Sequence, residues 1–293
     1  MKAGYQERKL QIKSEDGARI GYRLSSQQQS KPLITLLHGL ASNCTRFSEF
    51  IEYTELHEKW DLLRLDLRGH GESMYRGHYT RDTWLSDLQL VLKSEHYHQS
   101  VFLGHSLGAQ IGIEFASQFP DKTRGLILID PVFPEHLQGR LGKAKKYRFI
   151  LVVIRTLLRF FNKLGFKRRQ IPKRDLRELD ERTRETLAKH PELTIADLYT
   201  NPFADFKYLP LANYLQDINE VIKPLPALEK IEVPVLVLLS AGATVSSFEQ
   251  TQEMINRFPN AKIETVDADH WLLTEKPEET RKIIENWCAK TFQ

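Results

Sequence analysis

The sequence contains no run of about 18 or more apolar residues, so it predicts no membrane-spanning helix. The opening stretch MKAGYQERKLQIKSED lacks the apolar segment of a secretory signal, and we expect none. There are only two cysteines, Cys44 and Cys288, without metal-binding or redox spacing. Two free thiols fit the reducing cytoplasm, which is the location that we expect.

Acidic residues are missing from one long stretch. Between Arg140 and Arg174 there are 13 Lys and Arg and no Asp or Glu, which leaves 29 basic against 38 acidic residues elsewhere. The basic character is therefore local and needs a local explanation. No known nucleic-acid-binding motif is interleaved with it, so we expect no nucleic-acid partner.

Short apolar or alternating runs recur at both ends of the chain, separated by segments with helical spacing. The Asp16-Gly17 pair between the first two runs predicts a hairpin. Strands that alternate with helices predict an α/β fold with a mostly parallel, doubly wound sheet. Strands are predicted over 9–15, 18–25, 32–39, 60–69, 100–106, 125–130, 233–240 and 261–268, and helices over 47–57, 80–97, 107–119, 247–258 and 277–290.

The alternation stops in the middle of the chain. From Pro131 to about Pro226 the sequence has helical stretches and no convincing strand. We therefore predict a helical cap, residues 133–224, inserted after the sixth strand of a core formed by residues 1–132 and 225–293.

A nucleophile motif, Gly104-His105-Ser106-Leu107-Gly108, lies between the apolar run SVFL and the helical segment LGAQIGIEF. A strand that turns sharply into a helix presents a serine hydroxyl at an exposed apex, and only glycine fits beside so tight a turn. The alternative is a structural serine at an ordinary turn. The flanking strand and helix favour the nucleophile.

Three motifs, LLHG at 36–39, DLRGHGES at 66–73 and GHSLG at 104–108, resemble those of the α/β-hydrolase superfamily, and the resemblance covers nearly the whole chain except the cap. It implies an α/β-hydrolase fold and a serine nucleophile. It also implies that His270, after the last strand, is the catalytic base, and that the backbone N–H groups of Leu40 and Leu107 hold the oxyanion.

Three more residues close to the motifs are expected around the substrate, namely His38, Gly39 and His105. We expect His38 to order its turn by hydrogen bonds, and His105 to point into the elbow, away from the Ser106 hydroxyl. His70 lies in a neighbouring loop and is a weaker candidate.

The usual triad acid is missing. In many family members an aspartate follows the strand after the cap, but here Ser240 and Ala243 occupy the motif's glycine and aspartate positions. Asp130 ends the strand beside that of Ser106, and the carboxyl ends of parallel strands share one edge of the sheet. We therefore predict that Asp130 is the triad acid, in the order Ser, Asp, His.

Two alternatives to Asp130 stay open. In the first, the triad acid has been lost at Ala243. In the second, Asp66, which we expect to pair with Arg68, contributes the acid. Asp267 and Asp269 flank His270, but residues so close in one loop seldom reach its Nδ1 atom, and we expect them to shape the turn.

The basic stretch contains YRFILVVIRTLLRFFNK, in which Arg148, Arg155, Arg159 and Lys163 form one narrow helical stripe. The plainest interpretation is a cap helix whose apolar side packs on the core while its stripe is solvated. A second is peripheral contact with an anionic membrane. A third is capture of an anionic group of the substrate.

Together these features predict a serine hydrolase that cleaves carboxylic esters with an apolar acyl or alcohol part through an acyl-enzyme, without metal or organic cofactor. The first alternative is a thioesterase or a lysophospholipase-like lipase, which the basic cap favours. The second is a non-catalytic binding protein on the same fold, which the absent acid at Ala243 favours. The sequence leaves the oligomeric state open.

Overall fold

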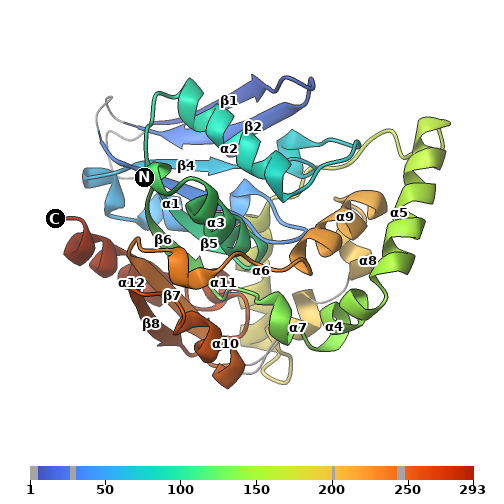
Figure 1. Cartoon of the computed structure of the whole chain (residues 1–293). Helices are drawn as coiled ribbons and strands as arrows, with labels where there is room; N and C mark the ends of the chain where they lie inside the picture. The colour runs from blue at the N-terminus through green and yellow to red at the C-terminus, as the bar shows by residue number, and fades with distance from the viewer. Residues whose placement is uncertain (1–5, 27–30, 200–201, 243–247) are drawn as a thin grey trace.

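The structure is a computed structural model that describes residues 6–26, 31–199, 202–242 and 248–293. Its described strands form one eight-stranded sheet in the order β1-β2-β4-β3-β5-β6-β7-β8 (Figure 1). The strands are β1 Glu7–Lys13, β2 Arg19–Ser25, β3 Leu33–Leu37, β4 Asp61–Leu65, β5 Ser100–His105, β6 Thr123–Ile129, β7 Val235–Ser240 and β8 Ala261–Val266.

Most of the sheet is parallel, as the sequence predicts. Strands β1 and β2 form an antiparallel hairpin, and β2 is antiparallel to β4, whereas the remaining pairs from β4 to β8 run parallel. The predicted hairpin turn is present, and Gly17 adopts a φ of +83° that a residue with a side chain rarely tolerates.

Helices cover both faces of the sheet because its central strands are apolar on both sides. Phe102 of β5 packs into one hydrophobic cluster with α2, α3 and α10, whereas its neighbours Val101 and Leu103 pack into a second cluster with α1, α11 and α12. These helices are α1 Ser48–Tyr53, α2 Arg81–Ser94, α3 Leu107–Gln118, α10 Phe248–Ile255, α11 Leu272–Glu275 and α12 Pro277–Thr291.

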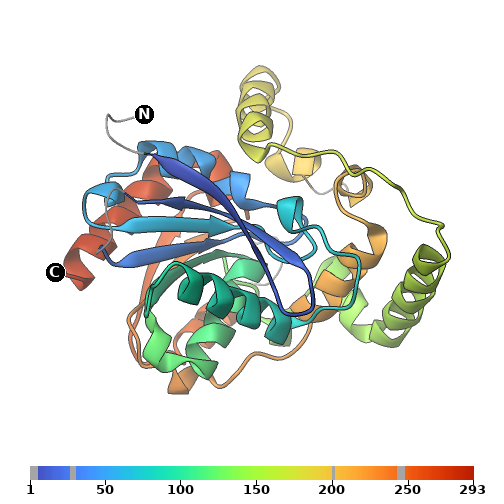
Figure 2. The ribbon, with the colours of Figure 1, turned by 90° about the horizontal axis from the view of Figure 1, so that it is seen from above.

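The described residues between β6 and β7 contain helices and no strand, and the α-helices among them lie within residues 133–224. They form a layer beside the carboxyl edge of the sheet (Figures 1 and 2). They are α4 Gly139–Lys146, α5 Arg148–Lys163, α6 Leu176–Lys189, α7 Ile195–Tyr199, α8 Pro202–Asp205 and α9 Leu211–Val221. Short 3₁₀ helices are η1 Cys44–Phe47, η2 Leu56–Glu58, η3 Gly71–Ser73, η4 Pro120–Lys122, η5 Pro134–His136 and η6 Leu228–Lys230.

Buried polar contacts hold the cap on the core. Arg46 of η1 forms a buried ion pair with Asp180 of α6. The Tyr79 hydroxyl donates to Asp217 of α9 at 2.9 Å, and the Asn213 amide of the same helix donates to the Gly69 carbonyl at 3.0 Å. Because each contact joins the two parts of the molecule far from water, helices α6 and α9 are fixed relative to the sheet.

Helix α5 lies at the rim of the molecule, outside α9 (Figures 1 and 2). Its orientation contradicts the plainest interpretation of its sequence, in which the apolar side packs inward. Phe149 is 80% exposed and Leu157 is 52% exposed, whereas the guanidinium of Arg155 has buried nitrogen atoms. The arginine stripe therefore faces the protein and the apolar side faces outward.

Within the described ranges, no helix combines the length and the hydropathy that are needed to cross a lipid bilayer.

Candidate active site

The Ser106 elbow occupies the sharp turn between β5 and α3. Ser106 has a φ of +53° and a ψ of −111°, a strained conformation for a residue with a side chain. A Cβ atom at Gly104 would lie 2.3 Å from the Gly108 backbone, and one at Gly108 would lie 2.0 Å from the Leu37 carbonyl oxygen. The sequence therefore needs both glycines for this turn, which leaves the partly exposed Ser106 at its apex.

Asp130 meets His270 across the carboxyl edge of the sheet. The Asp130 Oδ2 atom lies 2.5 Å from His270 Nδ1, although the two residues follow different strands, β6 and β8. The other carboxylate oxygen, Oδ1, accepts hydrogen bonds from the backbone N–H of Ser240 at 3.0 Å and from its hydroxyl at 2.9 Å. Ser240 therefore fixes one carboxylate oxygen of Asp130, and the other oxygen orients the imidazole of His270.

Electrostatics keep Asp130 ionised. Burial by itself would raise the pKa of its carboxyl group, but the hydrogen bond and charge of His270, with the two bonds from Ser240, outweigh burial and hold the pKa below its usual value of 3.8. Asp130 also has a φ of +43°, a second strained residue at the same edge. An ionised carboxylate at Nδ1 stabilises an imidazolium and favours the tautomer whose Nε2 atom can accept a proton.

His105 supports the loop that carries His270. Its Nε2 atom lies 2.9 Å from the His270 carbonyl oxygen, and the two rings are 4.8 Å apart between centroids. Burial and the nearby His270 lower the pKa of His105 to about 3, so this side chain is neutral at physiological pH. A neutral His105 with its proton on Nε2 donates to that carbonyl and fixes the position of His270.

The loop after β3 approaches the nucleophile closely. A Cβ atom at Gly39 would lie 3.4 Å from the Ser106 Cβ and 3.2 Å from His105 Nδ1, which fits the small residue found there. Leu40 follows directly and lines the same pocket as Ser106. Leu107 is the first residue of α3, where backbone N–H groups have no partner within the helix. Both predicted oxyanion donors therefore belong to segments that adjoin Ser106.

His38 has a structural position. Its side chain is fully buried, its Nε2 atom accepts the Leu67 N–H at 3.0 Å, and its Nδ1 atom lies 2.8 Å from the Gly39 carbonyl oxygen. It orders the turn, as we expected, but it does not line the pocket. The prediction that His38 binds substrate is therefore corrected, whereas Gly39 and His105 do line the pocket.

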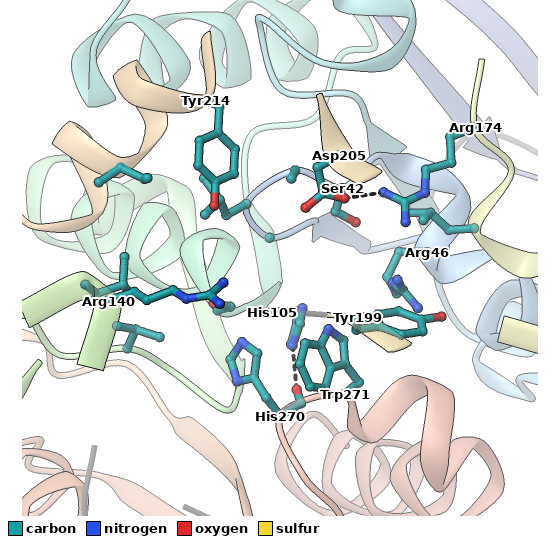
Figure 3. Close-up of a pocket in the computed structure, with 18 residues that line it drawn as sticks. Ser42, Arg46, His105, Arg140, Arg174, Tyr199, Asp205, Tyr214, His270 and Trp271 are labelled. Atoms are coloured by element: carbon teal, nitrogen blue, oxygen red, sulfur yellow. Dashed lines mark hydrogen bonds and ion pairs between the residues drawn. The ribbon is translucent and has the colours of Figure 1, made fainter. Parts of the chain in front are cut away.

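A cavity of about 280 Å³ joins these groups beneath the cap (Figure 3). Ser106 and His270 both line it, although no hydrogen bond joins the Ser106 hydroxyl to the His270 ring in the part of the chain that the structure describes. In ligand-free enzymes such contacts often tighten only when substrate binds. The lining residues are Gly39, Leu40, Ala41, Ser42, Arg46, His105, Ser106, Val132, Arg140, Leu141, Arg174, Leu176, Tyr199, Asp205, Tyr214, Ile218, His270 and Trp271.

Sequence reasoning missed most of the polar groups that line this cavity around the triad residues. Arg140, Tyr214 and Arg46 reach it from three separate elements (Figure 3). Arg174 donates to Asp205 at 2.6 Å, and Arg46 is paired with Asp180, so each of these two arginines has a carboxylate partner. Arg140 and Arg174 are the first and last residues of the basic stretch that the sequence shows. The sequence does not tell which basic residues of that stretch face the cavity.

The alternative acids have separate partners. Asp66 does not pair with Arg68, contrary to our expectation: its carboxylate accepts the backbone N–H of Cys44 and of Glu72, each at 2.7 Å. Arg68 pairs instead with Asp87 and Asp16.

The two aspartates beside His270, Asp267 and Asp269, make no hydrogen bond to its ring among the described residues. Ala243, the position where the family's usual aspartate is absent, lies outside the described residues.

Metal ligands are not gathered at this site. Among the described residues, no group of three or more His, Cys, Asp or Glu side chains is arranged to hold a metal ion.

Comparison with known proteins identifies the family of the chain. The family model described as serine aminopeptidase, S33, matches residues 28–276. The chain belongs to this family of α/β hydrolases. Among curated members of the superfamily, an sn-1-specific diacylglycerol lipase from Mus musculus is 24% identical over 277 residues, which cover 92% of this chain and 85% of the relative. A probable lysophospholipase L2 from Haemophilus influenzae is 24% identical over 292 residues, with 92% and 87% covered.

Solved α/β-hydrolase structures match the whole fold. A thermophilic esterase from Thermogutta terrifontis superposes with a TM-score of 0.71 at 22% identity, over 98% of this chain and all of that one. A hydrolase from Pseudomonas aeruginosa gives 0.70 at 20% identity, over 96% and 98%. At this identity the similarity shows the α/β-hydrolase fold, and the chemistry must be argued from the site.

Proposed function

We propose that the protein is a serine hydrolase that cleaves carboxylic esters with an apolar acyl or alcohol part. Ser106 is the nucleophile, His270 the general base and Asp130 the residue that orients His270. The observation that carries this proposal is the 2.5 Å contact between Asp130 Oδ2 and His270 Nδ1, in the same pocket as the strained Ser106 elbow.

The reaction has two steps. The Ser106 oxygen attacks the ester carbonyl while His270 Nε2 takes the hydroxyl proton, and the resulting oxyanion accepts hydrogen bonds from the N–H groups of Leu40 and Leu107. The intermediate collapses, the alcohol leaves with the proton from His270, and an acyl group stays on Ser106. Water then attacks the acyl carbon while His270 takes one of its protons. The bond between the acyl carbon and the Ser106 oxygen breaks, the acid is released, and His270 returns the proton to the Ser106 oxygen. Each oxyanion donor contributes about 3 kcal/mol to lowering the barrier.

The pocket lining supports an ester that is apolar on one side of the carbonyl. Leu40, Val132, Leu141, Leu176 and Ile218 line the cavity beside Ser106. A volume of about 280 Å³ fits a small ester or one arm of a longer one. The names of the relatives, which include an esterase and two lipases or lysophospholipases, agree with ester hydrolysis.

A lysophospholipase or a thioesterase is the second candidate, because one relative is a probable lysophospholipase and arginines line part of the pocket wall. Arg46 and Arg174 weaken this candidate, since Asp180 and Asp205 already neutralise them. A non-catalytic binding protein is disfavoured, because the positive φ of Ser106 costs about 1–3 kcal/mol that binding alone does not require.

Turnover of p-nitrophenyl esters from acetate to laurate, beside a lysophospholipid, tests the proposal. We expect kcat/KM to be highest for a neutral ester and to fall at least about 10⁴-fold in Ser106→Ala. Turnover by the wild type that does not exceed that of Ser106→Ala would reject the proposed activity. A clear preference for the lysophospholipid would favour the second candidate.

We also propose a cytoplasmic location, because Cys44 and Cys288 are both free and buried and form no disulfide with each other.

A further inference from the structure

The outer face of α5 is a continuous apolar surface. At about 100° per residue, its members fall within an arc of about 140° on the helix. The outer face of α5 consists of Phe149, Ile150, Val153, Ile154, Leu157, Phe160, Phe161 and Leu164, whose exposed fractions range from 40% to 80%.

The opposite side of α5 is anchored through its arginines. Arg148 Nε donates to Asn219 of α9 at 3.0 Å, and Arg159 donates to His78 Nδ1 at 3.0 Å while its guanidinium lies 5.9 Å from the centre of the Tyr79 ring. A rotation of α5 that buried the outer face would expel these side chains from their partners. The exposure of the apolar residues is therefore a built feature of the cap rather than incomplete packing.

The size of this surface is that of the largest apolar patches found on folded monomers. With about 200 Å² per aromatic ring, the three phenylalanines of the outer face alone expose on the order of 350 Å², and five aliphatic side chains add to it. Phe166, just beyond the helix, is 74% exposed as well. The largest apolar patch on a soluble monomer is about 300–600 Å² and often marks an interaction site.

The charges around the outer face favour an anionic partner. Exposed lysines and arginines flank it at both ends, and no Asp or Glu occurs between residues 140 and 174. A second copy is a poor partner, because it would bring another segment with 13 basic and no acidic residues into the same interface. An anionic bilayer offers hydrocarbon for the apolar face and lipid phosphates for its rim. The flanking residues are Lys143, Lys145 and Lys146 before the helix and Lys163, Lys167, Arg168 and Arg169 at and after its end.

We propose that the outer face of α5 inserts into the surface of an anionic lipid bilayer, with the helix lying in the membrane plane. The preceding helix, α4, supplies Arg140 and Leu141 to the wall of the candidate active site, so docking holds the pocket beside the lipid. This inference rests on the helix and its charges and does not depend on ester hydrolysis.

Co-sedimentation with phospholipid vesicles tests the proposal. The full-length protein should bind vesicles made of equal parts phosphatidylglycerol and phosphatidylcholine far better than pure phosphatidylcholine. Raising the salt from about 0.1 M to about 1 M, which shortens the Debye length from about 10 Å to about 3 Å, should weaken the binding. Ser106→Ala should bind like the wild type, which separates docking from catalysis.

Two pairs of variants probe the two parts of the surface. Phe149→Ser with Phe160→Ser should lower the partition coefficient at least about tenfold. Tyr53→Ser changes an aromatic residue on α1 that is 52% exposed, close to the 56% of Phe160, and should leave the coefficient unchanged. Lys163→Glu with Lys167→Glu should also lower it at least about tenfold. Lys59→Glu with Lys290→Glu makes the same charge change elsewhere and should have a smaller effect.

Three results would overturn the proposal. The first is equal binding to anionic and neutral vesicles. The second is unchanged binding in the double phenylalanine variant when circular dichroism shows that it is folded. The third is a stable dimer in light scattering that this variant dissociates, because the outer face would then be covered by a second copy.

Discussion

Replacing Asp130 with asparagine reverses the hydrogen bond at the His270 ring while keeping the shape of the side chain. The amide oxygen of the asparagine, in the place of Oδ1, can still accept both bonds from Ser240, now made at 3.0 Å and 2.9 Å. The amide NH₂ group then faces His270 Nδ1, where the carboxylate accepts now. Because an amide donates at this position, it selects the tautomer whose proton sits on Nε2, and that tautomer cannot accept the Ser106 proton.

The size of the effect follows from the contact. A full negative charge about 4 Å from a developing imidazolium contributes about 4 kcal/mol at an effective dielectric constant of about 20. At about 1.4 kcal/mol per decade, this charge contributes about 10³-fold in rate. The wrong tautomer adds to that loss, and the corresponding substitution in a well-studied Ser-His-Asp enzyme costs about 10⁴-fold. We therefore expect kcat/KM of Asp130→Asn to fall by about 10³- to 10⁴-fold.

The assay is hydrolysis of the best p-nitrophenyl ester from neutral to alkaline pH, together with urea unfolding of both proteins. The matched controls are Asp267→Asn and Asp269→Asn, which remove the two carboxylates closest to His270 in sequence and should keep kcat/KM within about threefold of the wild type. A folded Asp130→Asn enzyme with activity within about tenfold of the wild type would refute the assignment of the acid. A gain of activity in Ala243→Asp would instead indicate an acid lost after β7.

Three further predictions concern neighbouring groups. Ser240→Ala removes the hydroxyl bond to Asp130 but keeps the backbone bond, so steady-state kinetics should show kcat about fivefold lower with KM unchanged. Asp180→Ala leaves the buried Arg46 unpaired and should lower the free energy of unfolding in urea by about 3–5 kcal/mol. The same change at the exposed Glu181, partner of Arg177, should cost less than about 1 kcal/mol. The folded-state pKa of Asp130 lies below 3.8, so its ionised carboxylate stabilises the folded protein above that pH, and this contribution is lost as the pH falls through the folded-state pKa. The difference in the free energy of unfolding between the wild type and Asp130→Asn should therefore shrink when urea unfolding is repeated at increasingly acidic pH.

The sheet was predictable because its signals are local. Each apolar or alternating run that predicts a strand became one, and the Ser106 elbow could be located because its sharp turn needs glycine at positions 104 and 108. The proximity of Asp130 to His270 followed from topology, since parallel strands deliver their carboxyl ends to one edge.

Most other contacts between distant segments were not predictable. Asp66 was expected to pair with its neighbour Arg68, but that arginine reaches Asp87 on α2 instead. The second partner of Asp130, Ser240, lies 110 residues away, and only its polarity at the end of a buried strand hinted at a role. Such pairs depend on how loops approach one another in space, which neither periodicity nor spacing encodes.

Helix α5 shows the limit of pattern reasoning most clearly. Its periodicity correctly separates an apolar face from an arginine stripe, but periodicity does not tell which side meets the protein. Polar partners decide which side meets the protein. Asn219 on α9 and His78 on the core accept hydrogen bonds from the arginines, so the apolar face points outward.

Covalent labelling of the nucleophile tests the central claim most directly. After reaction with a fluorophosphonate, intact-protein mass spectrometry and peptide mapping should show one adduct, located on Ser106, because only an activated serine reacts fast. The labelling rate should fall in Asp130→Asn by orders of magnitude. No adduct on the folded wild-type protein, or an adduct at another residue, would contradict the claim that Ser106 is activated by His270 and Asp130.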